Sequence, residues 1–274
     1  MVILKISKTW ENRAKEESPY DVIFGKFQGH RLKELLRDTE IQELVDRGSE
    51  KMVNELDVKG KIILDAGIGP LARFSSIFSR LDAYVIAIDI SRSTLESARK
   101  VLNGKKVNLI QADIMNLPFK KEIFNLSFCY GTLYHMPDGR MGVQKALKEL
   151  ARVTRRNDII YFNVENYVNP INWSQMIVRK VLMVVGKNQP HHTFFNYSML
   201  PNIIKRSNMR IVEIKTTFEL WGPLIFIPTI FLRPIIKIWI VMDEKISKLS
   251  NKIHFFRFIG VGWFLIVEKY HDPD

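Results

Sequence analysis

Short apolar runs alternate with helical patterns in the middle of this chain. The runs KIILD (61–65), AYVIAID (83–89), KVNLIQAD (106–113), IFNLSFCY (123–130) and NDIIYFNVE (157–165) have the length and composition of buried strands. Between them, SRSTLESARKVL (91–102) and GRMGVQKALKELARVT (139–154) have apolar residues at helical spacing, with Ser91 as a helix N-cap. This alternation predicts βαβ units and a mostly parallel sheet covered on both faces.

The segments outside this core predict further elements. Residues 1–58 have the pattern of helices, and 197–217 contain a helix and a sixth strand. The ranges 166–196 and 218–257 interrupt the alternation, and 258–274 hold a seventh strand and a tail. We therefore expect an α/β, Rossmann-like fold with seven strands. An N-terminal helical cap (1–58) precedes the core (59–165), and the two insertions form a helical lid.

Acidic residues end the first three predicted strands. Asp65, Asp89 and Asp113 each close an apolar run. Because ligands of such sheets bind outside the carboxyl ends of the strands, the three carboxylates are expected at one site.

A glycine pair follows the first strand in LDAGIGPLARF (64–74). Gly67 and Gly69 have G-x-G spacing, which lets a backbone approach a ligand closely, and Ala72 completes G-x-G-x-x-A. Asp89, at the end of the second strand, suits the hydroxyls of a ribose. These features serve NAD and S-adenosylmethionine (SAM) equally.

Three other features favour SAM. Asp65 places a carboxylate in the turn, where it repels a pyrophosphate but suits the cationic methionine part of SAM. Pro70 offers no N–H to a phosphate. Asp113 leads into Leu117-Pro118-Phe119, which sets a polar group beside an apolar wall and suits an adenine.

Together, LDAGIGPLARF, VIAIDIS, IQADIMNLPF, FNLSFCYGTLYHM and LKELARVTRRNDIIYFNVEN resemble the class I SAM-dependent methyltransferases, in the branch of ubiquinone/menaquinone-type and other small-molecule enzymes. The resemblance covers residues 60–165 and the final strand. It implies that Asp65, Gly67 and Gly69 hold the methionine part and Asp89 the ribose. It further assigns Asp113, Ile90 and Ile114 to the adenine, and Tyr130 and Gly131 to the methionine side.

The chain departs from the family pattern at three places. Pro70 stands for the third glycine, Asn125 for an acid in the fourth strand, and Arg156-Asn157-Asp158 for a Pro-Gly-Gly turn. A dinucleotide-binding domain and a non-catalytic SAM-binding protein stay open as alternatives.

Candidates for catalysis follow the fourth strand. Tyr134 and His135 are expected near the transferred methyl, with His135 as a base or substrate-orienting group. The favoured interpretation is that His135 packs as a loop residue against the methionine part. His191 and His192 could reach over the site from the first insertion, but a solvated loop pair is the favoured interpretation.

Charge and cysteine content narrow the partners. The net charge of +12 arises between residues 61 and 217, where basic residues precede predicted strands: Lys61, Lys105, Lys106, Lys120, Lys121, Arg155 and Arg156. They should gather at the amino ends of the sheet, away from the site, which disfavours nucleic acid as a partner. The single cysteine, Cys129, excludes an internal disulfide, and no metal site is expected. The expected location is cytoplasmic.

The insertions are unusually apolar. LWGPLIFIPTIFL (220–232) has no charge, but prolines and later charges break it too often for a membrane span. Such insertions suit either an ordinary lid core or an apolar acceptor and contact with the inner membrane surface. We therefore expect a SAM-dependent methyltransferase for a small, apolar or lipid-linked acceptor, such as an isoprenoid quinone precursor, lipid or glycolipid. An RNA (tRNA) methyltransferase is the alternative enzyme.

Overall fold

The computed structural model describes residues 39–169, 191–217 and 260–269 continuously. It also describes these single residues: Glu11, Asn172, Trp173, Met176, Ile177, Lys180, Met183, Val184, Ile238, Met242, Lys245, Ile246, Lys248, Leu249, Ile253 and Phe258. Most of the predicted N-terminal cap and of both insertions lies outside the described residues, so the lid stays a prediction.

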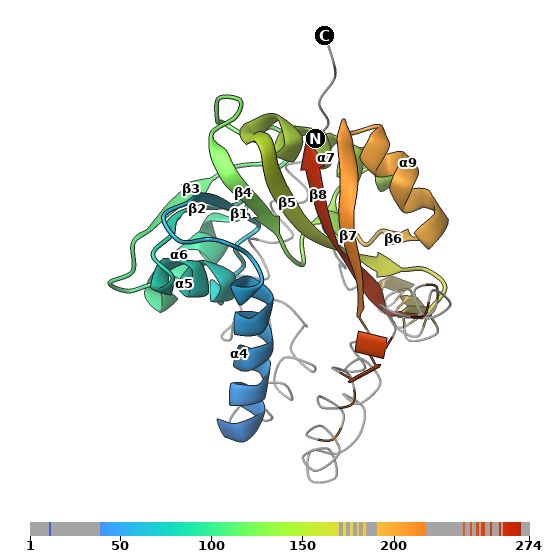
Figure 1. Cartoon of the computed structure of the whole chain (residues 1–274), viewed down its shortest axis with the longest axis horizontal. Coiled ribbons are helices and arrows are strands. Elements are labelled where there is room, and N and C mark those ends of the chain that lie inside the picture. The colour runs from blue at the N-terminus through green and yellow to red at the C-terminus, as the bar shows by residue number, and fades with distance from the viewer. Residues whose placement is uncertain are drawn as a thin grey trace.

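The main sheet has the strand order β3-β2-β1-β4-β5-β8-β7 (Figure 1). Its parallel strands are β1 (Ile62–Ala66), β2 (Tyr84–Asp89), β3 (Val107–Gln111), β4 (Phe124–Cys129) and β5 (Thr154–Asn166). β8 (Gly262–Lys269) lies antiparallel between β5 and β7 (Met209–Thr217). The predicted Rossmann-like, mostly parallel sheet is confirmed. Its order reverses between β1 and β4, where sheets of this kind bind ligands.

Helices cover both faces of the sheet. They are α4 (Thr39–Asn54), α5 (Arg73–Arg80), α6 (Arg92–Val101), α7 (Arg140–Val153) and α9 (Leu200–Lys205). Successive side chains of a strand point to opposite faces. Ile63 therefore packs into the cluster that holds residues of α4, α5 and α6, whereas Leu64 packs into the one that holds residues of α7 and α9. Figure 1 shows α5 and α6 gathered near β1–β3, and α9 beside β7.

Two local features differ from the prediction. A short strand, β6 (Phe194–Phe195), pairs with the end of β5, so the last residues of the range 166–196 join the sheet. β5 begins at Thr154, and the register between β4 and β5 shifts in this region. Asn157 has φ +63° there, a conformation that asparagine tolerates better than most residues. Asn157 thus provides, within the long strand β5, the backbone turn for which the family pattern has Pro-Gly-Gly.

Asn125 in β4 replaces an acid of the family pattern with a bridging amide. Its Oδ1 accepts a hydrogen bond from the Ile62 N–H at 3.1 Å, and its Nδ2 donates to Oδ2 of Asp158 at 3.0 Å. An amide can do both because it carries a donor and an acceptor. The substitution therefore links β1, β4 and β5 at the amino end of the sheet.

Candidate cofactor and acceptor site

The glycine turn after β1 is held by the end of β2. The N–H groups of Gly67 and Ile68 both donate to the Ile88 carbonyl, at 2.9 and 3.0 Å. Gly67 has φ +87°, and a Cβ there would lie 2.0 Å from Oγ1 of Thr132. Gly69 has φ +65°, but no atom lies within 4 Å of its Cβ position. At residue 67, both packing and backbone geometry require glycine. At residue 69 only the backbone geometry requires it, because the space around its Cβ position is open.

Asp65 is the penultimate residue of β1, and its carboxylate is buried. It is 3 % exposed, and its Oδ2 accepts a hydrogen bond from Oγ of Ser75 at 2.6 Å. Burial raises the pKa of Asp65 to about 6, the bonds from Ser75 oppose this rise, and the charge of Asp89 adds to it. A cation placed beside this carboxylate would therefore be stabilised.

Asp89 ends β2 and faces the same turn. Its Oδ2 accepts from the Gly69 N–H at 3.3 Å and its Oδ1 from the Ser91 N–H at 3.0 Å. Burial raises its pKa to about 6 in spite of these bonds. Gly69 and Asp89 are twenty residues apart in the chain, so the predicted pairing of the turn with this carboxylate is present in the fold.

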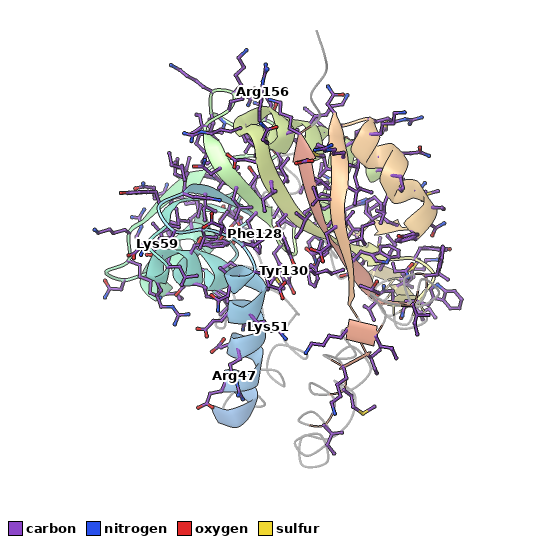
Figure 2. All side chains as sticks on the ribbon, in the orientation of Figure 1. Arg47, Lys51, Lys59, Phe128, Tyr130 and Arg156 are labelled. Atoms are coloured by element: carbon purple, nitrogen blue, oxygen red, sulfur yellow. The ribbon has the colours of Figure 1, made fainter. Side chains whose placement is uncertain are left out.

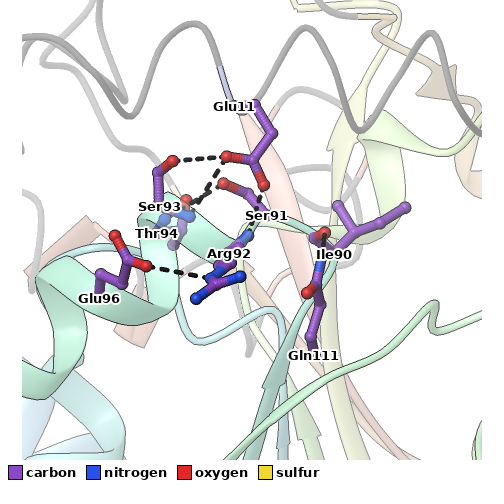
Figure 3. A network of polar contacts seen from close by, with 8 residues as sticks. All are labelled: Glu11, Ile90, Ser91, Arg92, Ser93, Thr94, Glu96 and Gln111. Carbon is purple, nitrogen blue, oxygen red and sulfur yellow. Dashed lines mark hydrogen bonds and ion pairs between the residues drawn. The ribbon is translucent and has the colours of Figure 1, made fainter.

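The predicted N-cap of α6, Ser91, is confirmed, and the carboxylate of Glu11 also binds the start of this helix. Oγ of Ser91 accepts from the Thr94 N–H at 3.1 Å. The Glu11 carboxylate accepts hydrogen bonds from the backbone N–H groups of Arg92 and Ser93 and from the Ser93 hydroxyl (Figure 3). Burial by itself would raise the pKa of Glu11, but these hydrogen bonds outweigh it and lower the pKa. Glu11 thus contacts the start of the helix that follows Asp89.

The third acid, Asp113, closes a turn after β3. Its Oδ1 accepts from the Met115 N–H at 2.9 Å, and its backbone C=O accepts from the Asn116 N–H at 2.9 Å. Ile90 and Ile114 differ in exposure. Ile90 is half-buried, whereas Ile114 is 6 % exposed and packs into the core. Little of the Ile114 side chain is therefore left to contact a ligand.

Tyr130 and Gly131 follow β4 directly. The Tyr130 ring packs against Phe74 and Phe264, with centroids 4.8 and 5.6 Å apart. Gly131 has φ +70°, and its N–H donates to Oδ1 of Asn163 in β5 at 2.7 Å. The hydroxyl of Tyr134 lies 3.5 Å from the Cβ position of Gly131. The structure thus brings three predicted site residues together at the ends of β4 and β5.

The histidines form a cluster with Tyr134. His135 lies in the short helix η1 (Leu133–His135), and its Nδ1 is 2.8 Å from the His191 carbonyl oxygen. The rings of Tyr134 and His192 have centroids 4.8 Å apart. The His192 side chain is only 5 % exposed and contacts Glu165, so the interpretation of a solvated loop pair is wrong for His192. The contact joins residues 27 positions apart, which no local pattern reveals.

Sequence reasoning missed several of these partners. Ser75, Thr132 and Asn163 give no signal in the chain, because each is an ordinary polar residue that acts through a tertiary contact. Glu165 could have been found, since it ends the fifth strand as Asp65 and Asp89 end the first two.

Arg156 is one of the basic residues expected at the amino ends of the strands, away from the site, and the structure places it there. Figure 2 shows Arg156 and Tyr130 at opposite ends of the sheet. Arg156 there pairs with Glu122 at 3.2 Å. Within the described part of the chain, no helix is long and apolar enough to span a membrane, and no cluster of three or more potential metal ligands occurs.

This open α/β sheet has carboxylates at the ends of its strands and a glycine turn at its topological switch point. Such an arrangement is typical of proteins that bind a nucleotide-containing cofactor. A family model described as a methyltransferase domain matches residues 64–162. That part of the chain is similar to the methyltransferase domains that this family model describes.

Individual proteins are also similar in sequence to this chain. The O-methyltransferase rstn1 of Aspergillus nomiae is 28 % identical over 43 % of this chain and 55 % of its own length. An uncharacterized protein of Methanocaldococcus jannaschii is 27 % identical over 77 % of this chain and 78 % of its own. The chain spans about half the length, or less, of the first curated relatives it matches.

A solved structure shares the fold. Magnesium protoporphyrin IX methyltransferase from Synechocystis PCC 6803, with bound S-adenosylhomocysteine, superposes with a TM-score of 0.54 at 14 % identity. The match covers 96 % of this chain and 93 % of that one. The two proteins therefore share a fold, and the match includes nearly the whole of this chain.

The residues at the site fit SAM, the cofactor of this class. Open space lies over Gly69, where a flat ligand can rest on the backbone. Asp65 and Asp89 have raised pKa values because burial leaves their negative charge poorly compensated. A ligand with a positive charge and hydroxyl donors would satisfy both carboxylates.

Proposed function

We propose that this protein transfers a methyl group from SAM to a small-molecule acceptor. The observation that carries the proposal is the pair of carboxylates on either side of the Gly67–Gly69 turn, the buried Asp65 and the half-buried Asp89, within a matched methyltransferase domain. SAM supplies an activated methyl on a sulfonium. The protein mainly has to hold the acceptor in line with it and exclude water.

Each predicted cofactor-binding residue has a role in this proposal. Asp65 faces the cationic methionine part, and Gly67 and Gly69 let the backbone approach it. The oxygens of Asp89 accept from the ribose hydroxyls in addition to the two backbone groups they already hold. Ile90 and Asp113 serve the adenine, with a minor contact from Ile114. Tyr130 and Gly131 line the methionine side.

The acceptor is proposed to be apolar or lipid-linked, such as an isoprenoid quinone precursor, lipid or glycolipid. Among the residues that the structure describes, ten of the fifteen exposed large hydrophobic side chains belong to the two insertions. Val184 is 87 % exposed, Ile177 63 % and Ile238 60 %. Exposed apolar side chains such as these suit an apolar ligand or a membrane surface.

An RNA acceptor has less support. RNA binding draws on clustered positive charge around the bound substrate. Arg155 and Arg156 lie at the start of β5, whereas Asp65, Asp89 and Tyr130 lie at the carboxyl ends of their strands.

Transfer of tritiated methyl from SAM into a total cell extract tests the proposal. The extract is then separated into lipid, RNA, protein and small-metabolite fractions. We expect label in the lipid or metabolite fraction, and none with Asp89→Ala. Label confined to RNA would support the alternative enzyme, and no label with intact SAM binding would indicate a non-catalytic protein.

Liposome co-sedimentation tests membrane contact separately. Wild type should pellet with anionic vesicles, and Ile177→Ser with Val184→Ser should reduce the pelleted fraction. Absence of binding by the wild type would remove the membrane contact and leave the methyl transfer untouched.

A further inference from the structure

His192 and Glu165 form a largely buried histidine–carboxylate pair near the carboxyl end of β5. Nε2 of His192 lies 2.7 Å from Oε2 of Glu165, and the two side chains are 5 % and 19 % exposed. A carboxylate only accepts hydrogen bonds, so Nε2 carries the proton and donates it. Nδ1 of the neutral ring then holds a lone pair, and it is buried without a hydrogen-bond partner among the described residues.

The unpartnered lone pair indicates a missing donor. Most buried polar atoms have a partner, and one without a partner costs stability until a donor arrives. The imidazole is packed among the rings of Tyr134, His135 and Phe194, with centroids 4.8, 5.2 and 4.4 Å away. A hydrogen-bond donor would have to approach Nδ1 past these rings.

The His192–Glu165 pair lies at the same edge of the sheet as the cofactor residues, where the parallel strands have their carboxyl ends. Glu165 is near the carboxyl end of β5, as Tyr130 follows the carboxyl end of β4. The Thr193 N–H donates to the Tyr134 carbonyl at 2.7 Å, which fixes the His192 segment against η1. The Tyr134 hydroxyl in turn lies over Gly131. A chain of contacts thus joins His192 to the proposed methionine side.

Resting on the proposed function, we propose that His192 is the general base of the transfer and that the acceptor group is a hydroxyl. The acceptor oxygen forms a bond to the methyl carbon, and the methyl–sulfur bond breaks with its electron pair left on sulfur. The hydroxyl proton passes to Nδ1 of His192. Glu165 is a positioning residue that holds the tautomer and stabilises the imidazolium.

A hydroxyl fits this arrangement better than an amine. A neutral amine attacks with its own lone pair and can lose its proton afterwards, whereas a hydroxyl gains much nucleophilicity from proton removal during attack. His192 takes the role predicted for His135 because its ring has the buried carboxylate that orients it.

Other titratable groups face His192 from each neighbouring element. Glu165 approaches from β5, Tyr134 and His135 from η1, and His191 precedes it in the chain. Partial burial lowers the pKa of His191, with the charge of His192 acting in the same direction and that of Asp138 opposing it. His191 is exposed, and its side chain contacts Thr193 at 3.1 Å. Its side chain is therefore a suitable control.

The tautomer can be tested without any acceptor. The full chain labelled with ¹⁵N-histidine is compared with His192→Gln to assign the His192 signals. At pH 8 we expect Nε2 to be protonated and Nδ1 to be unprotonated. A proton on Nδ1 would overturn the proposal, because that atom could not then accept one.

Three variants test the catalytic role. His192→Gln keeps an amide near Glu165 but removes the base, Glu165→Gln removes the orienting charge, and His191→Gln is the control. Each is assayed for SAM affinity by calorimetry and for tritium transfer into the extract between pH 5.5 and 9. Methyl ethers among the products are identified by cleavage with hydriodic acid.

We expect His192→Gln to bind SAM as wild type does and to transfer label at least about 100-fold more slowly, as for loss of a general base. The acid limb of the wild-type pH profile should disappear with it. Glu165→Gln should lower kcat about tenfold or more without changing KM for SAM. His191→Gln should match wild type.

The outcomes separate this inference from the proposed function. Transfer by His192→Gln within about threefold of wild type, or label found on nitrogen, would overturn the base and leave the methyltransferase standing. Loss of SAM binding in His192→Gln would instead make the pair structural. SAM binding by wild type without any transfer would overturn both proposals.

Discussion

Thr132 fills the space that a side chain at residue 67 would need, with its Oγ1 2.0 Å from the Cβ position of Gly67. The end of β4 therefore packs directly onto the glycine turn after β1. Two segments of the site, far apart in the chain, hold each other in place.

Gly67→Ala should damage both stability and SAM binding. It adds a methyl group at φ +87° against Thr132, so we expect a loss of roughly 3 kcal/mol or more in the free energy of unfolding from strain and overpacking. Gly60→Ala is the matched control, since Gly60 has φ +70° but no atom within 4 Å of its Cβ position. The control should cost only about 1–2 kcal/mol and leave SAM binding intact. Equal losses in urea unfolding would contradict the packing argument.

Asp65→Asn should stabilise the ligand-free protein at neutral pH while weakening SAM binding. The pKa of Asp65 is raised from 3.8 to about 6, so the folded state favours the protonated form. The associated stability is present below pH 4 and is lost as the pH rises through 6. Asparagine can still accept the Ser75 hydrogen bond without carrying the charge.

The stability gain of Asp65→Asn should thus grow between pH 4 and pH 7 to the order of 2–3 kcal/mol. Urea unfolding at pH 5 and pH 8 measures this. Asp82→Asn, at an exposed position, is the control and should change little. A variant that is less stable than wild type at pH 8 would rule out a strained, buried charge at this position.

Glu11→Gln should weaken the start of α6. The Glu11 carboxylate caps two backbone N–H groups there (Figure 3), and losing its charge should cost about 1 kcal/mol in unfolding free energy. Because the pKa of Glu11 is lowered, this stability is present above pH 4.5 and is lost as the pH falls below it. Glu96→Gln breaks only an exposed pair with Arg92 and should cost less than about 0.5 kcal/mol. If the two variants lose equal stability, the cap contributes nothing specific.

Cys129 should resist thiol reagents in the native protein. It is fully buried, and burial together with the charge of Asp65 raises the pKa of its thiol far above the ordinary value. We expect no reaction with Ellman's reagent at pH 8 until denaturant is added. Rapid labelling of the native protein would mean that the end of β4 opens readily.

Much of the core could be predicted from patterns of residues close together in the sequence. The apolar runs and the Ser91 cap mark β2 and α6 directly, because burial and capping act within a few residues. The carboxylates Asp65 and Asp89 could be placed at one edge, since parallel strands end together. Their partners could not, because Ser75 and Thr132 act through tertiary contacts.

The histidine cluster shows the same limit more sharply. The two histidines before β6 look like a polar loop in the sequence, and nothing local distinguishes them. In the fold His191 is exposed, whereas His192 turns inward to Glu165. The two-residue strand β6, too short to leave a pattern, brings this segment to β5.

Calorimetric titration of the full chain with SAM tests the central claim most directly. We expect saturable binding of SAM by wild type, no binding of NAD under the same conditions, and affinity for SAM at least about 100-fold lower in Asp89→Ala, which loses a charge-assisted pairing with two hydroxyls. Binding of NAD in preference to SAM, or unchanged SAM affinity in Asp89→Ala, would contradict the account.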